Sequence, residues 1–236
     1  SDKKDGIDIQ SGVFFKNLRR SGILTHNNQA IQRCGITKAR KKLSWTQFKD
    51  IAQKAVSLAY ELWPDDNAYQ WHGMNVIAID GSRHSLPGSE EIRIKYDPES
   101  CQLSPCKQYY PKGLVSIAYD SFRGIPIARK LSHAKASERE DALTLMNEIS
   151  LENVLYIMDR GYPAYSIIWE IQNRQSHFLM RCKGKKTFKA VKKFLESGKL
   201  DGYITISPES CRTSNIDAPK NELKPIVVRA IRYIDE

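Results

Sequence analysis

Two short apolar runs, each followed at once by an aspartate, constrain the fold more than any other feature of the sequence. The first run is Val76–Ile79, and Asp80 follows it. The second is Val154–Met158, and Asp159 follows it. Short apolar runs of this kind are typical of buried strands. Because strand-helix-strand crossovers have one preferred hand, we expect these two strands to lie side by side and parallel. Asp80 and Asp159 would then emerge together at one edge of the sheet.

Further strands and helices surround the two runs. Between them lie two strand candidates joined by a short connection with Gly124 near its end, which suits a hairpin. A capping box at Ser137 and Glu140 then opens a helix, and Pro163 is well placed to begin another. The elements predicted here are, in order, strands 76–79, 114–119 and 125–131, a helix, strand 154–158, a helix and strand 177–181. This order is typical of an α/β protein with a mixed sheet flanked by helices.

The two flanking regions have different patterns. Residues 1–70 are predicted to be helical and basic, and their clearest helix begins at Ser44 in an S-x-x-Q capping pattern and stops at Pro64. From residue 184 onward, a Lys-rich amphipathic stretch precedes two strand candidates, 203–207 and 226–234. We therefore expect three regions: a small helical region over 1–70, the α/β core over 71–183, and the start of a strand-rich insertion over 184–236.

The chain is basic along its whole length. It contains 37 Lys and Arg residues against 27 Asp and Glu residues, which gives a net charge of +10. Such a charge favours a polyanionic partner, nucleic acid first, although a basic globular protein of another kind is an open alternative. Lys107 and Lys112 flank two tyrosines and would suit a surface that follows a nucleic-acid strand. A loop packed on the sheet explains these two lysines equally well.

No sequence signal indicates an oxidising or membrane environment. The five cysteines are an odd number at irregular spacings, which favours reduced thiols over a disulfide framework or a zinc site. No apolar run is long enough to cross a bilayer, so we expect a soluble, intracellular protein without a membrane partner. The sequence starts at Ser1 without a methionine and stops at Glu236, and we expect both ends to belong to a longer parent.

Paired carboxylates at one sheet edge have a specific chemistry. Two carboxylates held close together repel each other at neutral pH unless a cation or a shared proton lies between them. Magnesium prefers oxygen ligands and keeps several waters, so Asp80 and Asp159 would suit a metal-dependent site for a phosphodiester. The alternative is structural, with Asp80 at the start of an Asp-Gly turn and Asp159 merely at the end of a strand.

Several motifs in the core carry a resemblance to a known family. They are Asp80-Gly81-Ser82, Ile117–Asp120, Ala136–Glu140 and, above all, the run Met158–Tyr165, which contains Asp-Arg-Gly-Tyr after an apolar strand. Together they resemble the core of an insertion-sequence transposase of the DDE class, the IS4-type family. The similarity spans roughly residues 36 to 183, and the Asp-Arg-Gly-Tyr block is its most specific part.

The resemblance implies a fold, a chemistry and partners. It implies a ribonuclease-H-like core in which Asp80 and Asp159 are the first two metal-binding acids, with Mg²⁺ as the cofactor and Mn²⁺ as a substitute. Arg160 and Tyr162 match positions near the DNA strand that is cut, and Lys183 lies where the DNA-contacting insertion begins. The implied partners are double-stranded DNA, at transposon ends and at the target, and a second copy of the chain assembled on that DNA. The implied location is the bacterial cytoplasm, at the nucleoid.

A third acid of the family has no match in this sequence. The resemblance implies a Glu within a Y-x2-R-x3-E-x6-K pattern after the insertion, and we expect it to lie beyond Glu236 in the parent. The leading function is therefore metal-dependent cleavage and strand transfer at transposon ends. The alternative is a catalytically inactive, truncated DNA-binding or regulatory fragment of such an enzyme.

Overall fold

The computed structural model describes residues 7–25, 33–102, 110–184, 187–211, 216 and 222–233. The chain forms two compact units, Ser1–Ala55 and Val56–Glu236. Lys107 lies outside the described residues, so its predicted contact with DNA has no structural counterpart here. Within the described ranges, no helix has both the length and the apolar character that a membrane span requires. Within the described residues, Cys34, Cys182 and Cys211 form no disulfide.

Helices make up the described part of the first unit. They are α1 (Ile7–Arg20), α2 (Arg33–Lys42) and the first part of α3 (Trp45–Leu62), which continues into the second unit. As predicted, α3 begins directly after Ser44. The Ser44 hydroxyl accepts a hydrogen bond from the backbone N–H of Thr46 at 3.3 Å, so it satisfies one of the donors left open at the start of a helix.

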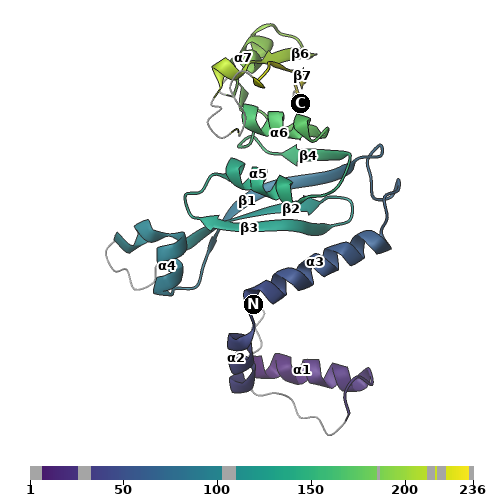
Figure 1. The fold of residues 1–236 in the computed structure, drawn as a ribbon, viewed down its shortest axis with the longest axis vertical. Helices are drawn as coiled ribbons and strands as arrows, with labels where there is room; N and C mark the ends of the chain where they lie inside the picture. Colours follow the sequence, from purple (N-terminus) through teal and green to yellow (C-terminus); the bar gives the residue numbers. More distant parts are fainter. Residues whose placement is uncertain are drawn as a thin grey trace. The chain divides into compact units, whose positions relative to one another are not determined.

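A five-stranded mixed sheet forms the centre of the second unit (Figure 1). Its strands are β1 (Asn75–Ser85), β2 (Lys112–Asp120), β3 (Ile125–His133), β4 (Val154–Met158) and β5 (His177–Met180), in the order β3-β2-β1-β4-β5. Strand β2 is antiparallel to both β1 and β3, whereas β4 is parallel to β1 and to β5. This order and these directions are those of a ribonuclease-H-like sheet, so the predicted fold class is confirmed.

Two helices cover one face of the sheet. Helix α5 (Glu138–Glu148) connects β3 to β4, and α6 (Tyr165–Asn173) connects β4 to β5. Their apolar side chains bury the inner residues of the strands in one cluster, which includes Ile77, Ile79, Ala118, Tyr156, Met158, Ala142, Leu145, Met146, Ile167 and Ile171. The apolar alternation of β1 and the apolar stripes of α5 and α6 therefore meet in a single core.

A smaller layer packs on the outer side of α6. It consists of α7 (Lys189–Glu196) and an antiparallel pair of strands, β6 (Asp201–Ile206) and β7 (Ile226–Ile231). A second apolar cluster joins this layer to α6 through Tyr165 and Ile168, which contact Ile206 and Ile226 of the two strands. The Tyr165 hydroxyl also donates a hydrogen bond of 2.7 Å to a backbone carbonyl just before β7.

Three local predictions were wrong in detail. Strand β1 does not end in a turn at Asp80 but continues to Ser85, because β2 pairs with it over that whole length. Ser137 is the residue before α5, yet its side chain makes no capping hydrogen bond. Helix α6 begins at Tyr165, two residues after Pro163. The short helix α4 (Glu90–Tyr96), capped by Ser89, was not predicted.

A buried arginine ties the start of the second unit to the sheet. The Arg123 guanidinium lies 4.2 Å from the ring centre of Tyr60 and binds Asp120 at 3.0 Å; the side chains of Arg123 and Asp120 are both fully buried. It also donates to Asp65, to Asn75 and to the backbone carbonyl of Trp63. Burial lowers the pKa of Arg123, but its hydrogen bonds to Asp120 and Asp65 outweigh that effect and raise it. Arg123 is therefore charged and fully paired inside the protein.

We predict that Arg123→Met destabilises the protein by about 3–5 kcal/mol, because it leaves the Asp120 carboxylate buried without its cationic partner. The measurement is the free energy of unfolding in urea. Arg129→Met, an exposed arginine on β3, is the matched control and should change that free energy little. A loss below about 1 kcal/mol for Arg123→Met would show that this pair does not anchor the sheet.

Candidate active site

Asp80 and Asp159 occupy equivalent places on two neighbouring parallel strands. Ile79 pairs with Met158 in the last step of the β1–β4 ladder; Asp80 is the next residue of β1, and Asp159 directly follows β4. Neighbouring strands lie about 4.8 Å apart, so the two backbones bring these residues side by side. Both aspartates are exposed, whereas Ile79 and Met158 are buried in the core. The expected parallel pairing of the two strands is thus present, although β1 continues past Asp80.

The motif after β4 forms a turn that sends its side chains in different directions. The backbone N–H of Tyr162 donates to the carbonyl of Asp159 at 3.1 Å, which closes the turn. Arg139 of α5 donates its Nε–H to the carbonyl of Gly161 at 2.9 Å and so fixes the turn to the helix. Asp159 and Arg160 are exposed, and Tyr162 is buried.

Tyr162 lies inside the protein, and its predicted place near the DNA strand that is cut stays a prediction. Only 1% of this residue is exposed, and its hydroxyl has no hydrogen-bond partner among the described residues. An unsatisfied buried hydroxyl costs about 1–3 kcal/mol. Burial raises the pKa of Tyr162, and the negative charges of Glu138, Asp80, Asp141 and Asp159 raise it further. The hydroxyl therefore keeps its proton and remains a donor that points into an acidic environment.

The two aspartates fit a divalent cation. Exposed carboxylate oxygens are hard ligands of the kind that Mg²⁺ and Mn²⁺ prefer. In the parts of the chain that the structure describes, no three His, Cys, Asp or Glu side chains form a ready-made metal cage. The donor set thus suits an ion that keeps several waters and is held by one or two carboxylates, as is usual for Mg²⁺.

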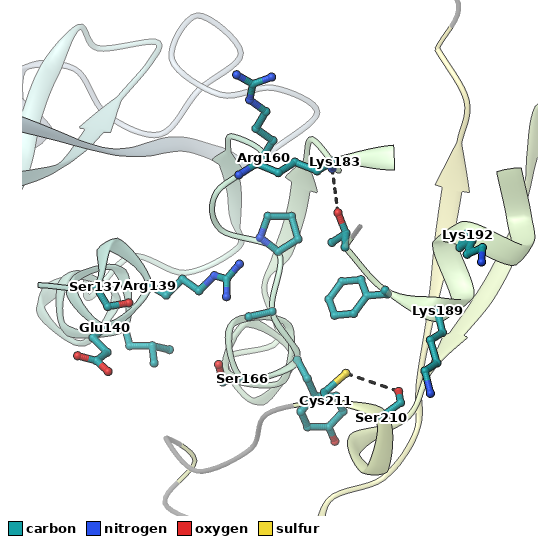
Figure 2. Close-up of a pocket in the computed structure, with 16 residues that line it drawn as sticks. Ser137, Arg139, Glu140, Arg160, Ser166, Lys183, Lys189, Lys192, Ser210 and Cys211 are labelled. Atoms are coloured by element: carbon teal, nitrogen blue, oxygen red, sulfur yellow. Dashed lines mark hydrogen bonds between the residues drawn. The ribbon is translucent and has the colours of Figure 1, made fainter. Parts of the chain in front are cut away.

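A basic pocket lies beside the turn after β4. It has a volume of about 700 Å³, and Figure 2 places Arg139 and Arg160 on one side and the lysines of α7 on the other. The basic side chains that line it are Arg139, Arg160, Lys183, Lys189 and Lys192, and Glu140 is the acidic residue of the lining. A concave surface with such an excess of positive charge attracts and concentrates anions.

The pocket unites two of the residues singled out in the sequence and adds three that were missed. Arg160 and Lys183 were predicted to contact DNA, and both line the pocket. The contributions of Arg139, Lys189 and Lys192 come from two helices that are distant in the sequence. In the sequence, Arg139 belongs to the Ser-Glu-Arg-Glu motif, and Lys189 and Lys192 belong to the Lys-rich stretch. Neither pattern indicates that these three side chains line one pocket.

Lys112 does not belong to this pocket. It is the first residue of β2 and pairs with Ser85 at the far end of β1, five positions beyond Asp80. Its backbone N–H donates to the Asp97 carboxylate at 2.9 Å. The predicted contact of Lys112 with nucleic acid therefore stays a prediction, and it concerns a different part of the sheet from the two aspartates.

Residues 71–232 match a family model described as "Transposase DDE domain". The chain belongs to this family. The matched residues include the five-stranded sheet, both aspartates and the residues that line the basic pocket. No curated protein matches the sequence.

Two solved structures have a distant similarity to this chain. The "Mos1 transposase paired-end complex with left transposon end" has 10% identity and a TM-score of 0.32, over 79% of this chain and 62% of that one. The "Crystal structure of NurA bound to dAMP and manganese" has 9% identity and a TM-score of 0.15, over 79% of this chain and 57% of that one. The chain thus spans less than two thirds of either structure, and neither TM-score is high enough to establish a common fold.

Proposed function

We propose that the chain is the catalytic core of an IS4-type insertion-sequence transposase, which cuts DNA at transposon ends and transfers the freed strand to a target. The observation that supports this most is the register of β1 and β4, where the paired Ile79 and Met158 are each followed by an exposed aspartate. This arrangement lies within the part of the chain that matches the transposase DDE domain family.

Asp80 and Asp159 act in this proposal as the ligands of a divalent ion, Mg²⁺ or Mn²⁺. The two residues are exposed and follow paired positions of neighbouring strands, so their carboxylates can hold the ion against a phosphodiester while leaving positions for water and phosphate oxygens. An ion bound there would supply positive charge against the phosphate and make water a stronger nucleophile. The aspartates themselves orient the reacting groups, which contributes a large share of the rate in phosphoryl-transfer enzymes.

The basic pocket serves to hold the DNA backbone. Arg160 directly follows Asp159 and lines the pocket, so the pocket begins one residue along the chain from the second acid. Lys183 and the α7 lysines extend the positive surface away from the acids, as a bound strand with successive phosphates requires. We include the basic helical region 1–70 and a second copy of the chain among the parts that assemble on double-stranded DNA.

We predict that Asp80→Asn and Asp159→Asn each lower the rate of metal-dependent DNA cleavage roughly 100-fold or more, because even indirect support of a metal ligand has an effect of about that size. The substrate is a plasmid that carries the DNA on both sides of the gene, incubated with Mn²⁺. Binding to the same DNA should change little, since each substitution keeps the shape of the side chain. Asp66→Asn, an exposed aspartate outside the site, is the control.

Two other outcomes would contradict the proposal. Cleavage by Asp80→Asn and Asp159→Asn at the rate of the unchanged chain would exclude these aspartates from the reaction. DNA binding without cleavage, both by the unchanged chain and by a chain extended to carry a Glu in the Y-x2-R-x3-E-x6-K pattern, would favour the alternative function, that of a DNA-binding or regulatory protein.

We predict that Arg160→Ala and Lys189→Ala each weaken DNA binding and reduce its dependence on salt. Each phosphate contact contributes about 0.9 to the slope of log affinity against log salt concentration, because the contact releases a counterion. The measurement is a DNA titration at several salt concentrations. Lys95→Ala, an exposed lysine on α4 that does not line the pocket, should leave the slope unchanged. Equal slopes for all three variants would remove the pocket from the DNA-binding surface.

A further inference from the structure

The side chain of Glu138 lies beside two glycines, Gly81 and Gly161, that come just after the two aspartates. Glu138 is the first residue of α5. A Cβ atom added to Gly81, next to Asp80, would lie 3.0 Å from its Cγ. A Cβ atom added to Gly161, in the turn after Asp159, would lie 3.5 Å from its Oε2. The two glycines therefore leave room for Glu138, whose side chain lies close to both segments that carry the aspartates.

Glu138 is held loosely. In the described part of the chain, its polar partner is Arg83, in an ion pair of 3.9 Å, and 32% of its side chain is exposed. An exposed pair at this separation stabilises one conformation only weakly. The Glu138 carboxylate can therefore exchange this partner for another at little cost.

Asp141, one turn further along α5, is bound quite differently. It is buried and accepts hydrogen bonds from Ser116 at 3.0 Å and from Ser132 at 2.7 Å. Lys130 adds an ion pair of 3.0 Å. Asp141 is thus committed to linking α5 to the sheet, whereas Glu138 remains available to a ligand.

The hydroxyl of Tyr162, which has no hydrogen-bond partner among the described residues, is under the influence of the same acids. It is buried, and no described residue accepts its proton. After burial, the largest influence on its pKa is the charge of Glu138, ahead of the charges of Asp80, Asp141 and Asp159. A buried donor is normally paired, so a hydroxyl left without an acceptor beside four acids indicates that one of them moves toward it in another state.

We propose that Glu138 is a third carboxylate ligand of the divalent ion held by Asp80 and Asp159, and that Tyr162 positions Glu138 by donating a hydrogen bond to it. The inference rests on the proposed function and deepens it, because it adds a ligand to the same site. Without the ion, Glu138 pairs with Arg83. Among the described residues these three carboxylates do not form a ready-made metal cage, so Glu138 must leave Arg83 to reach the ion, and the Tyr162 hydroxyl then gains its acceptor. Glu138 contacts the ion directly, and Tyr162 is a positioning residue.

The test is Mn²⁺ binding by the whole chain without DNA, followed through the electron paramagnetic resonance signal of free Mn²⁺. We expect Glu138→Gln to weaken Mn²⁺ binding by about tenfold or more, the size of effect known for groups that support metal ligands. Glu148→Gln, an exposed glutamate at the other end of α5, should bind Mn²⁺ as the unchanged chain does. Unfolding without metal should show Glu138→Gln to be as stable as the unchanged chain, because the substitution removes a negative charge from an acidic cluster.

Two further variants test how the residues act together. Tyr162→Phe should weaken Mn²⁺ binding in the unchanged chain but not in Glu138→Gln, since it acts through Glu138. Arg83→Gln should strengthen Mn²⁺ binding by freeing Glu138, and this gain should also vanish in the Glu138→Gln background. A gain of equal size in both backgrounds would mean that Arg83 acts only through its charge, which would contradict the proposed exchange of partners.

The main outcomes separate this proposal from the function on which it rests. Weak binding by Asp80→Asn together with unchanged binding by Glu138→Gln would overturn the role of Glu138 and leave the two-aspartate site intact. Unchanged binding by both variants would overturn the site itself. Weak binding by both, with Glu148→Gln unaffected, is the result that the proposal requires.

Discussion

The parallel pairing of β1 with β4 is the constraint on which the rest of the structure depends. It joins segments far apart in the sequence, and α5 makes the connection between β3 and β4 that allows it. The pairing is held in register because Ile79 and Met158 must both face the core under α5 and α6. A shift of one residue would turn these side chains to solvent, which a buried sheet does not tolerate. The same register places Asp80 beside Asp159. The packing of the core therefore also determines where the two aspartates lie.

The turn after β4 divides three tasks among neighbouring residues. Asp159 stays at the strand end with Asp80, Arg160 lines the basic pocket, and Tyr162 enters the core beneath the acids. Arg139 holds the turn from α5 through the carbonyl of Gly161. The turn thus connects two kinds of site. The aspartates repel one another, and the basic pocket beside them attracts phosphate. Such a neighbourhood suits a reaction in which a metal ion and a nucleic-acid backbone meet.

Much of this arrangement follows from local sequence patterns. The apolar runs before Asp80 and Asp159, and the helices between the strands, were sufficient to predict the mixed sheet and its parallel pair. The length of β1 was not predictable, because the Asp80-Gly81-Ser82 turn signal is overridden by pairing with β2 through Ser85. The direction of side chains could not be predicted from the sequence either. The motif indicated that Tyr162 lies near the acids, but its burial depends on packing against the core. Glu138 belonged to a recognised motif, yet its position depends on how α5 crosses the sheet.

The most direct measurement of the central claim is anomalous diffraction from crystals of the chain grown with Mn²⁺. The structure predicts a Mn²⁺ peak at the carboxyl end of β4, within about 2.1 Å of a carboxylate oxygen of Asp80 and of one from Asp159. A peak that contacts only one of the two aspartates, or Mn²⁺ bound elsewhere with no peak between them, would contradict a metal site built by the pairing of β1 and β4.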